Sequence, residues 1–129
     1  MILEVDTSTS EPVYEQIVRQ IEDHVRAGTL PPGAALPSIR QLADDLELNP
    51  NTVAKAYKLL ELSRVILTAG RKGTFVRSEA PDQIAQKRHN DLAAKMKDMV
   101  SDFLGKGLSP DEVKSAFDTA LGVKSDTKT

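Results

Sequence analysis

The sequence predicts a mainly α-helical fold that carries one small β-hairpin. In several segments the apolar residues recur three and four positions apart, which is the period of an amphipathic helix. Two runs that favour strands, "VILT" and "TFVR", stand on either side of the Gly-containing link "AGRKG", a pattern typical of a hairpin. Clusters of proline and glycine separate these segments and indicate where each one ends.

The first predicted helix begins near Pro12 and ends at Gly28. The segment that follows it, "TLPPGAALPS", contains three prolines and cannot continue a helix, so it leaves room only for a short extended piece around residues 34 to 36. The apolar face of this helix is formed by residues at helical spacing, namely Tyr14, Ile17, Val18, Ile21 and Val25.

Two further helices are predicted before the hairpin. Ser38 is expected to cap a helix of about two turns, because Gln41 follows it at the spacing of a capping box. After "ELNP", Asn49 suits the N-cap position of the next helix and Pro50 its first turn. The residues expected to face the core are Ile39, Leu42, Ala43 and Leu46 in the shorter helix, and Val53, Ala56, Tyr57 and Leu60 in the longer one.

The longer of these helices and the hairpin carry an excess of positive charge. Residues 48–77 hold six basic residues and one acid, although the whole chain has a net charge of −2. At 100° per residue, Asn51, Lys55 and Lys58 point away from the buried stripe. The predicted order is a helix, a short helix, a turn, a third helix and a basic hairpin. This order predicts a winged helix-turn-helix.

This arrangement favours binding to DNA. An α-helix fits the major groove, so Asn51 and Thr52 near the helix start are expected to reach base edges, where an amide suits adenine. Further along the helix, Lys55 and Lys58 are expected to contact phosphates. At the hairpin tip, Arg71 and Lys72 are expected to enter the adjacent minor groove or contact its backbone.

Ordinary structural roles compete with this interpretation. Asn49 and Pro50 are common helix-start residues, and exposed lysines are usually only solvated. Packing or surface roles are favoured for His24 and His89, since a single histidine without a spaced second ligand is weak evidence for a metal site, and the chain has no cysteine. No catalytic motif is present, so we expect neither an enzyme nor a cofactor. The DNA interpretation depends on the helix face, the turn and the basic hairpin occurring together.

The motifs "LPSIRQLA", "NPNTVAKAY" and "GTFV" carry a close resemblance, over residues 11 to 77, to the N-terminal domain of the GntR family of bacterial transcription regulators. Two positions depart from the family pattern. Arg64 follows the recognition helix where glycine is usual, at a cost of about 1 kcal/mol if it is left-handed, and the first wing glycine is displaced to Gly70. The resemblance implies DNA contacts at the matching positions Ser38, Arg40, Asn49, Asn51, Thr52, Lys55, Arg71, Lys72, Gly73 and Thr74.

Residues 78–129 are expected to form two helices. "RSEAPD" is interpreted as a linker, and a helix from about Asp82 to Leu104 follows it. A heptad-like apolar seam runs along that helix through Ala85, His89, Leu92, Met96, Met99 and Phe103, and is widened by Val100 and Leu104. A capping box at Ser109 opens a second helix that buries Val113, Ala116, Phe117, Ala120 and Leu121, and the tail "GVKSDTKT" is expected to be disordered.

These two helices favour dimerisation over ligand binding. A drug-sized ligand needs a pocket of roughly 300–1,000 Å³, which two helices from one chain do not easily enclose. The architecture resembles the short YtrA-type subgroup of the GntR family, whose helix pair serves dimerisation. The expected domains are therefore 1–77 for DNA binding and 78–129 for dimerisation, the latter through Leu92, Met96, Met99, Val100, Phe103, Val113, Phe117 and Leu121.

The sequence thus predicts a homodimeric, sequence-specific regulator of transcription, expected to be a repressor that binds a palindromic operator in double-stranded DNA. Neither a membrane span nor a signal peptide is predicted, so a cytoplasmic location is expected. Two alternatives are a non-specific architectural DNA-binding protein and a winged-helix module that binds another protein. The controlling signal is left open between an unknown small-molecule effector at the dimer interface, around His89, and some other signal.

Overall fold

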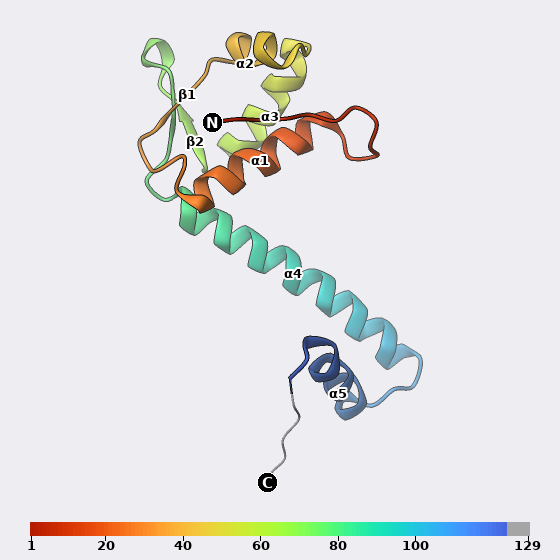
Figure 1. Cartoon of the computed structure of the whole chain (residues 1–129). Coiled ribbons are helices and arrows are strands. Elements are labelled where there is room, and N and C mark those ends of the chain that lie inside the picture. The colour runs from red at the N-terminus through yellow and green to blue at the C-terminus, as the bar shows by residue number, and fades with distance from the viewer. Residues whose placement is uncertain (124–129) are drawn as a thin grey trace. The chain divides into compact units, whose positions relative to one another are not determined.

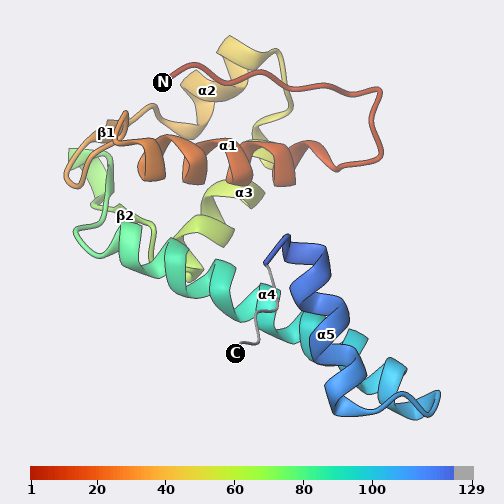
Figure 2. The same cartoon turned by 60° about the horizontal axis from the view of Figure 1, so that its bottom comes forward.

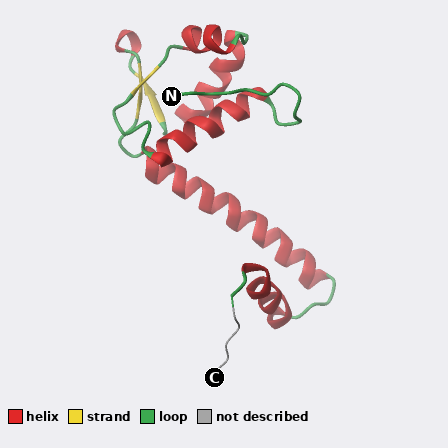
Figure 3. Cartoon of the chain, in the orientation of Figure 1, coloured by secondary structure: helices red, strands yellow, loops and turns green. Residues whose placement is uncertain are grey.

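The computed structural model describes residues 1–123 and divides into two compact units, of which the first is Met1–Lys87 and the second begins at Arg88. The predicted fold class, mainly helical with a small antiparallel sheet, is confirmed (Figures 1 and 3). Residues 124–129 of the tail that was expected to be disordered lie outside the described residues.

Two helices of the first unit, those that start after Ser38 and Asn49, begin at the caps that the sequence predicts. The Ser38 side-chain oxygen accepts a hydrogen bond from the backbone N–H of Gln41 at 3.1 Å, and the Asn49 side-chain oxygen accepts one from the N–H of Asn51 at 2.8 Å. Each bond satisfies an N–H group that the helix itself leaves without a partner. The bounds are Val13–Ala27 for α1, Ile39–Leu46 for α2 and Pro50–Leu62 for α3.

The sheet has one strand more than the predicted hairpin. Its strands are β1 (Ala35–Leu36), β2 (Ile66–Thr68) and β3 (Thr74–Val76), in the antiparallel order β1-β3-β2. The extended piece expected around residues 34 to 36 pairs with β3, on the side away from β2. Figure 3 shows the strands gathered at one side of the first unit.

The core of the first unit centres on α3. The predicted stripe of Val53, Ala56, Tyr57 and Leu60 is at most 1% exposed, and α3 packs against α1, as Figures 1 and 2 both show. The Tyr57 hydroxyl also donates a hydrogen bond to the carbonyl of Pro37 at 2.7 Å. Because Pro37 directly precedes the cap of α2, this bond links the two helices of the helix-turn-helix.

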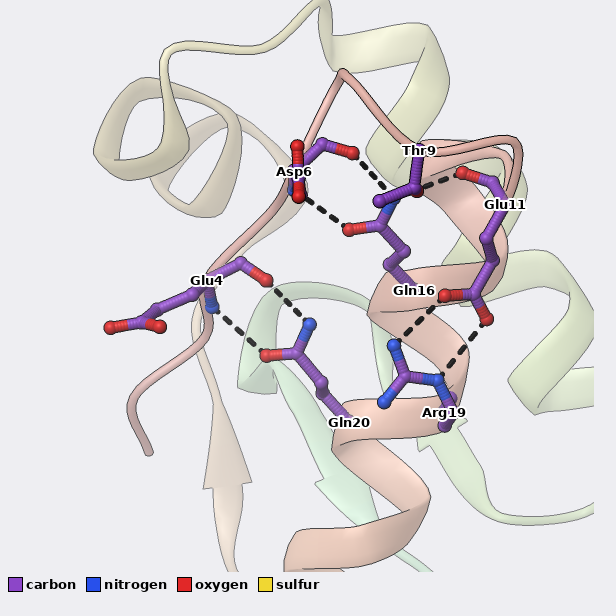
Figure 4. Close-up of polar contacts among 7 residues, drawn as sticks. All are labelled: Glu4, Asp6, Thr9, Glu11, Gln16, Arg19 and Gln20. Carbon is purple, nitrogen blue, oxygen red and sulfur yellow. Dashed lines mark hydrogen bonds and ion pairs between the residues drawn. The ribbon is translucent and has the colours of Figure 1, made fainter.

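The N-terminal segment, for which no structure was predicted, is held against α1 by side chains spaced four residues apart. The amide of Gln16 accepts from the N–H of Asp6 and donates to its carbonyl, both at 2.8 Å, and Gln20 bonds the backbone of Glu4 in the same two ways (Figure 4). One helical step of four residues is about 6 Å and two strand residues span about 6.6 Å, so the side chains match alternate residues of the extended segment. Leu3, directly before Glu4, is buried in the core, and Val5, between the two bonded residues, is partly buried against it.

The predicted linker turns directly into the next helix. α4 spans Ala80–Gly105 and starts two residues before the predicted Asp82, since Pro81 is well tolerated in a first helical turn. Ala80 and Ile84 are fully buried in the core of the first unit. Lys87 forms an ion pair with the largely buried Glu22 of α1 at 3.1 Å, so the first turns of α4 are part of the first unit.

Arg64 takes the left-handed conformation that its position after α3 requires, with a φ of 64°. Its guanidinium pairs with the carboxylate of Glu79 at 3.0 Å, and Arg77 pairs with the same carboxylate at 3.1 Å. The hydrogen bonds from Arg77 and then Arg64 lower the pKa of Glu79 to about 2. Two of the six basic residues in the 48–77 window are therefore paired with one acid outside it.

The second unit consists of the rest of α4 and the helix α5 (Pro110–Leu121), which opens with the complete capping box of Ser109 and Glu112. Val113 is buried and Phe117 is half-buried, but Leu121 is 74% exposed. The predicted burial of Ala116, Ala120 and Leu121 is therefore wrong within one chain, because the end of α4 alone offers too little surface to cover the whole apolar face of α5. No helix in residues 1–123 has the combined length and apolar character needed to cross a membrane.

Tyr57→Phe is expected to destabilise the first unit by about 1 to 2 kcal/mol, because it leaves the Pro37 carbonyl without its hydrogen-bond donor. Chemical denaturation of the two proteins measures the difference. Tyr14→Phe, which removes the hydroxyl of a half-buried tyrosine, is the matched control and should change the unfolding free energy by less than about 0.5 kcal/mol. Equal stability of Tyr57→Phe and the parent would contradict a contribution from this bond.

Glu79→Gln is expected to flatten the acid dependence of stability. A carboxyl whose pKa is lower in the folded state contributes stability above its ordinary pKa of 4.5, and this is lost as the pH falls toward 2. Denaturation midpoints measured between pH 2 and 6 should therefore fall less steeply for the variant. Glu61→Gln, which changes an exposed acid of α3, should keep the parent's slope.

Candidate nucleic-acid interface

Three structural elements that favour nucleic acid lie along one edge of the first unit. In Figure 1 the link between β2 and β3, helix α2 and the start of α3 all appear along the upper edge of this unit. The first turns of α2 and α3 present backbone N–H groups there, where the helix dipole favours phosphate. The edge thus combines a helix of major-groove size with a wing and two helix starts.

The outer side of α3 carries the residues predicted to contact DNA. Asn51, Lys55 and Lys58 are exposed and Thr52 is half-buried. Asn49 uses its side-chain oxygen in the cap but keeps its amide N–H groups as donors. Both asparagines therefore have amide donors available to a base edge or a phosphate.

The start of α2 is arranged for phosphate. The Ser38 oxygen accepts the N–H of Gln41, which leaves its own O–H able to donate. Arg40 is exposed, and no ion pair to it is found among residues 1–123. A hydroxyl, a guanidinium and free backbone N–H groups thus lie within one turn of helix.

The wing tip is a short 3₁₀ turn, Gly70–Lys72, that exposes both Arg71 and Lys72. The displaced glycine, Gly70, has a φ of 58°, and Gly73 has a φ of 109°, so both glycines supply the positive φ values that this turn needs.

Thr74 differs from the exposed contact that the family resemblance implied. It is only 8% exposed, in the central strand β3, where it pairs with Leu36 on one side and Thr68 on the other.

Charge pairing inside the first unit was not predicted. Glu79 engages Arg64 and Arg77, and the ammonium of Lys55 lies 4.0 Å from the centroid of the Tyr14 ring. Arg77 and Glu79 are only two residues apart, but Arg64 and Glu79, like Lys55 and Tyr14, come from different parts of the chain, so no local sequence signal predicts these two contacts. Within residues 1–123 no group of three or more potential metal ligands is close enough to hold an ion.

Comparison with known proteins supports the same interpretation. The profile of the family described as "Bacterial regulatory proteins, gntR family" matches residues 13–76. An HTH-type transcriptional regulator of Mycobacterium tuberculosis is 45% identical over 64% of this chain and 69% of its own length. The transcriptional repressor YtrA of Bacillus subtilis is 35% identical over 78% of each chain. These relatives are transcription regulators and not enzymes.

Solved structures resemble the chain beyond the winged unit. A transcriptional regulator from Oenococcus oeni matches with a TM-score of 0.70 and 32% identity, over 91% of this chain and 97% of its own. YtrA from Sulfolobus acidocaldarius, a GntR-family transcription factor, matches with a TM-score of 0.57 and 29% identity, over 93% and 97%. The predicted resemblance to short YtrA-type proteins is confirmed, and the chain belongs to the GntR family of bacterial transcription regulators, with a winged helix-turn-helix for binding DNA.

Proposed function

We propose that this protein is a cytoplasmic, homodimeric repressor that binds a palindromic operator in double-stranded DNA. The observation that carries the proposal is the exposed polar side of α3 next to two helix starts and a basic wing tip. A role as repressor is supported by the name of the Bacillus subtilis relative. A dimer with two-fold symmetry would read half-sites whose centres lie about 10 bp, or a multiple of that, apart.

Each element of the interface has a distinct role in this proposal. Asn51 and Thr52 read base edges in the major groove. Arg71, Lys72 and Gly73 bring the wing to the adjacent minor groove or its backbone. The residues assigned to phosphates are Ser38, Arg40, Asn49, Lys55 and Lys58, and Thr74, although only 8% exposed, is assigned to DNA together with the wing.

The electrostatic contribution to DNA binding is expected to be smaller than the number of basic residues in 48–77 suggests. The sequence gives about six basic groups per subunit, but Arg64 and Arg77 are already paired with Glu79. We therefore assign counterion release to Arg40, Lys55, Lys58, Arg71 and Lys72.

Dimerisation is assigned to residues 78–129. In the second unit Leu92, Met96 and Met99 are 59%, 37% and 47% exposed, although they form one predicted seam. A two-helix unit is too small to bury such a surface within itself. The face proposed to meet a second copy consists of Leu92, Met96, Met99, Val100, Phe103, Val113, Phe117 and Leu121.

A small-molecule effector at the dimer interface remains part of the proposal. An apolar hollow of about 270 Å³ lies between the end of α4 and α5, lined by Val100, Leu104, Val113 and Phe117 among others. It is slightly smaller than a typical site for a drug-sized ligand, so a second subunit would have to complete it. Screening small molecules for release of the operator tests this point.

The two alternative functions, an architectural DNA-binding protein and a module that binds another protein, predict results that differ from those of a sequence-specific repressor. A selection of preferred duplexes from random DNA should enrich a two-fold motif. An architectural DNA-binding protein would bind without enriching a motif, and a winged-helix module that docks another protein would have no salt-sensitive affinity for DNA.

Asn51→Ala is expected to relax base preference, with a loss of about 1 to 3 kcal/mol on the selected duplex and much less on random DNA, because it removes a contact to a base edge. Lys55→Ala should lower the affinity for both duplexes equally, and should lower the slope of log affinity against log salt concentration by about one per half-site. Titrations at several salt concentrations measure both effects. An equal loss on both duplexes for Asn51→Ala would count against direct readout.

Met99→Asp is expected to break the dimer, because it puts a charge in the middle of the apolar seam. Light scattering after gel filtration should give the mass of one chain, and operator affinity should fall sharply as the two half-sites become independent. Lys97→Asp, on the same helix but outside the seam, is the matched control and should stay dimeric. A dimeric Met99→Asp protein would rule out this seam as the interface.

A further inference from the structure

Tyr14, in the first turn of α1, contacts a residue of the proposed interface. The Lys55 ammonium lies 4.0 Å from the centroid of the Tyr14 ring. The ring is half-buried and packs against the core of the first unit, whereas the lysine is otherwise exposed. Tyr14 is not among the residues assigned to DNA above, and it comes from a helix that the helix-turn-helix does not include.

The contact restricts where the lysine can go. A lysine side chain is long and flexible, and in solvent it samples many rotamers. The face of an aromatic ring attracts an ammonium group. No carboxylate pairs with Lys55 among residues 1–123, so in this part of the chain its charge is held by the ring.

The same geometry leaves the lysine competent to bind an anion. An ammonium group has three N–H donors, and a ring can cover only one side of it. Lys55 is exposed on the outer side of α3, so solvent has access to the remaining donors. A phosphate oxygen can therefore approach without displacing the ring.

We propose that Tyr14 is a positioning residue for DNA binding, whose ring holds the Lys55 ammonium beside the recognition helix where it meets a backbone phosphate. The inference rests on the proposed function, which assigns Lys55 to a phosphate. Tyr14 adds no charge and touches no DNA itself. It acts through Lys55, because a side chain that is ordered in advance loses less freedom on binding.

Two substitutions in the full-length chain test the role of the ring. Tyr14→Leu removes the aromatic face but keeps an apolar side chain, and affinity for the duplex recovered by selection should fall about 2- to 10-fold per half-site. Tyr14→Phe keeps the face and loses only the 3.3 Å contact of the hydroxyl with Glu15, so its affinity should stay within about twofold of the parent. Thermal unfolding of both variants monitors the fold.

A double-mutant comparison separates positioning from general structural damage. In a Lys55→Ala background, Tyr14→Leu should cause no further loss of affinity, since the residue through which it acts is gone. A structural role of Tyr14 would persist in that background. Proton NMR adds a readout without DNA, because the ring should shift the ε-methylene resonances of Lys55 upfield in the parent and in Tyr14→Phe but not in Tyr14→Leu.

The possible failures are distinguishable. Tighter binding by Tyr14→Leu would mean that the ring withholds the lysine from DNA, and this result would overturn the inference alone. An unshifted Lys55 resonance in the parent, or a full Tyr14→Leu effect in the Lys55→Ala background, would do the same. If Lys55→Ala binds like the parent, the phosphate assignment in the proposed function fails, and the positioning role of Tyr14 fails with it.

Discussion

The burial of one side of α3 is the constraint on which the rest of the first unit depends. Val53, Ala56, Tyr57 and Leu60 are removed from water against α1 and the sheet, so the polar side of the same helix must face outward. The Tyr57 hydroxyl adds a fixed link to Pro37, directly before the start of α2. A surface suited to DNA is thus the consequence of a well-packed opposite side, because a helix has only two sides to divide between core and solvent.

The distribution of charge depends on pairing between elements. Glu79 engages both Arg64 and Arg77, which offsets one of their two positive charges and connects the end of α3 with the start of α4. Arg64 keeps a left-handed backbone that a glycine would adopt at lower cost, and this ion pair is the contact that a glycine would lack. Local net charge is therefore an incomplete guide to how strongly such a surface binds an anion.

Much of the fold was predictable, because the relevant signals are local. The caps at Ser38, Asn49 and Ser109 and the buried stripe of α3 follow from residues a few positions apart. The exposed candidates on α3 follow from the same periodicity. The early start of α4 was missed because "RSEAPD" was interpreted as a linker, although its proline is compatible with a first helical turn. The burial expected along α5 was overestimated because one chain does not supply enough surface to cover it.

The sequence by itself determined the helices, their caps, the side of α3 that faces solvent and the family to which the chain belongs. Only the tertiary structure decided that β1 joins the wing sheet, that the N-terminal segment lies along Gln16 and Gln20, that Arg64 shares the carboxylate of Glu79 with Arg77 and that Tyr14 contacts Lys55. The physical reason is one of distance along the chain. Periodicity and capping act within a few residues, whereas all of these contacts except that of Glu79 with the neighbouring Arg77 join residues that only the folded core brings together.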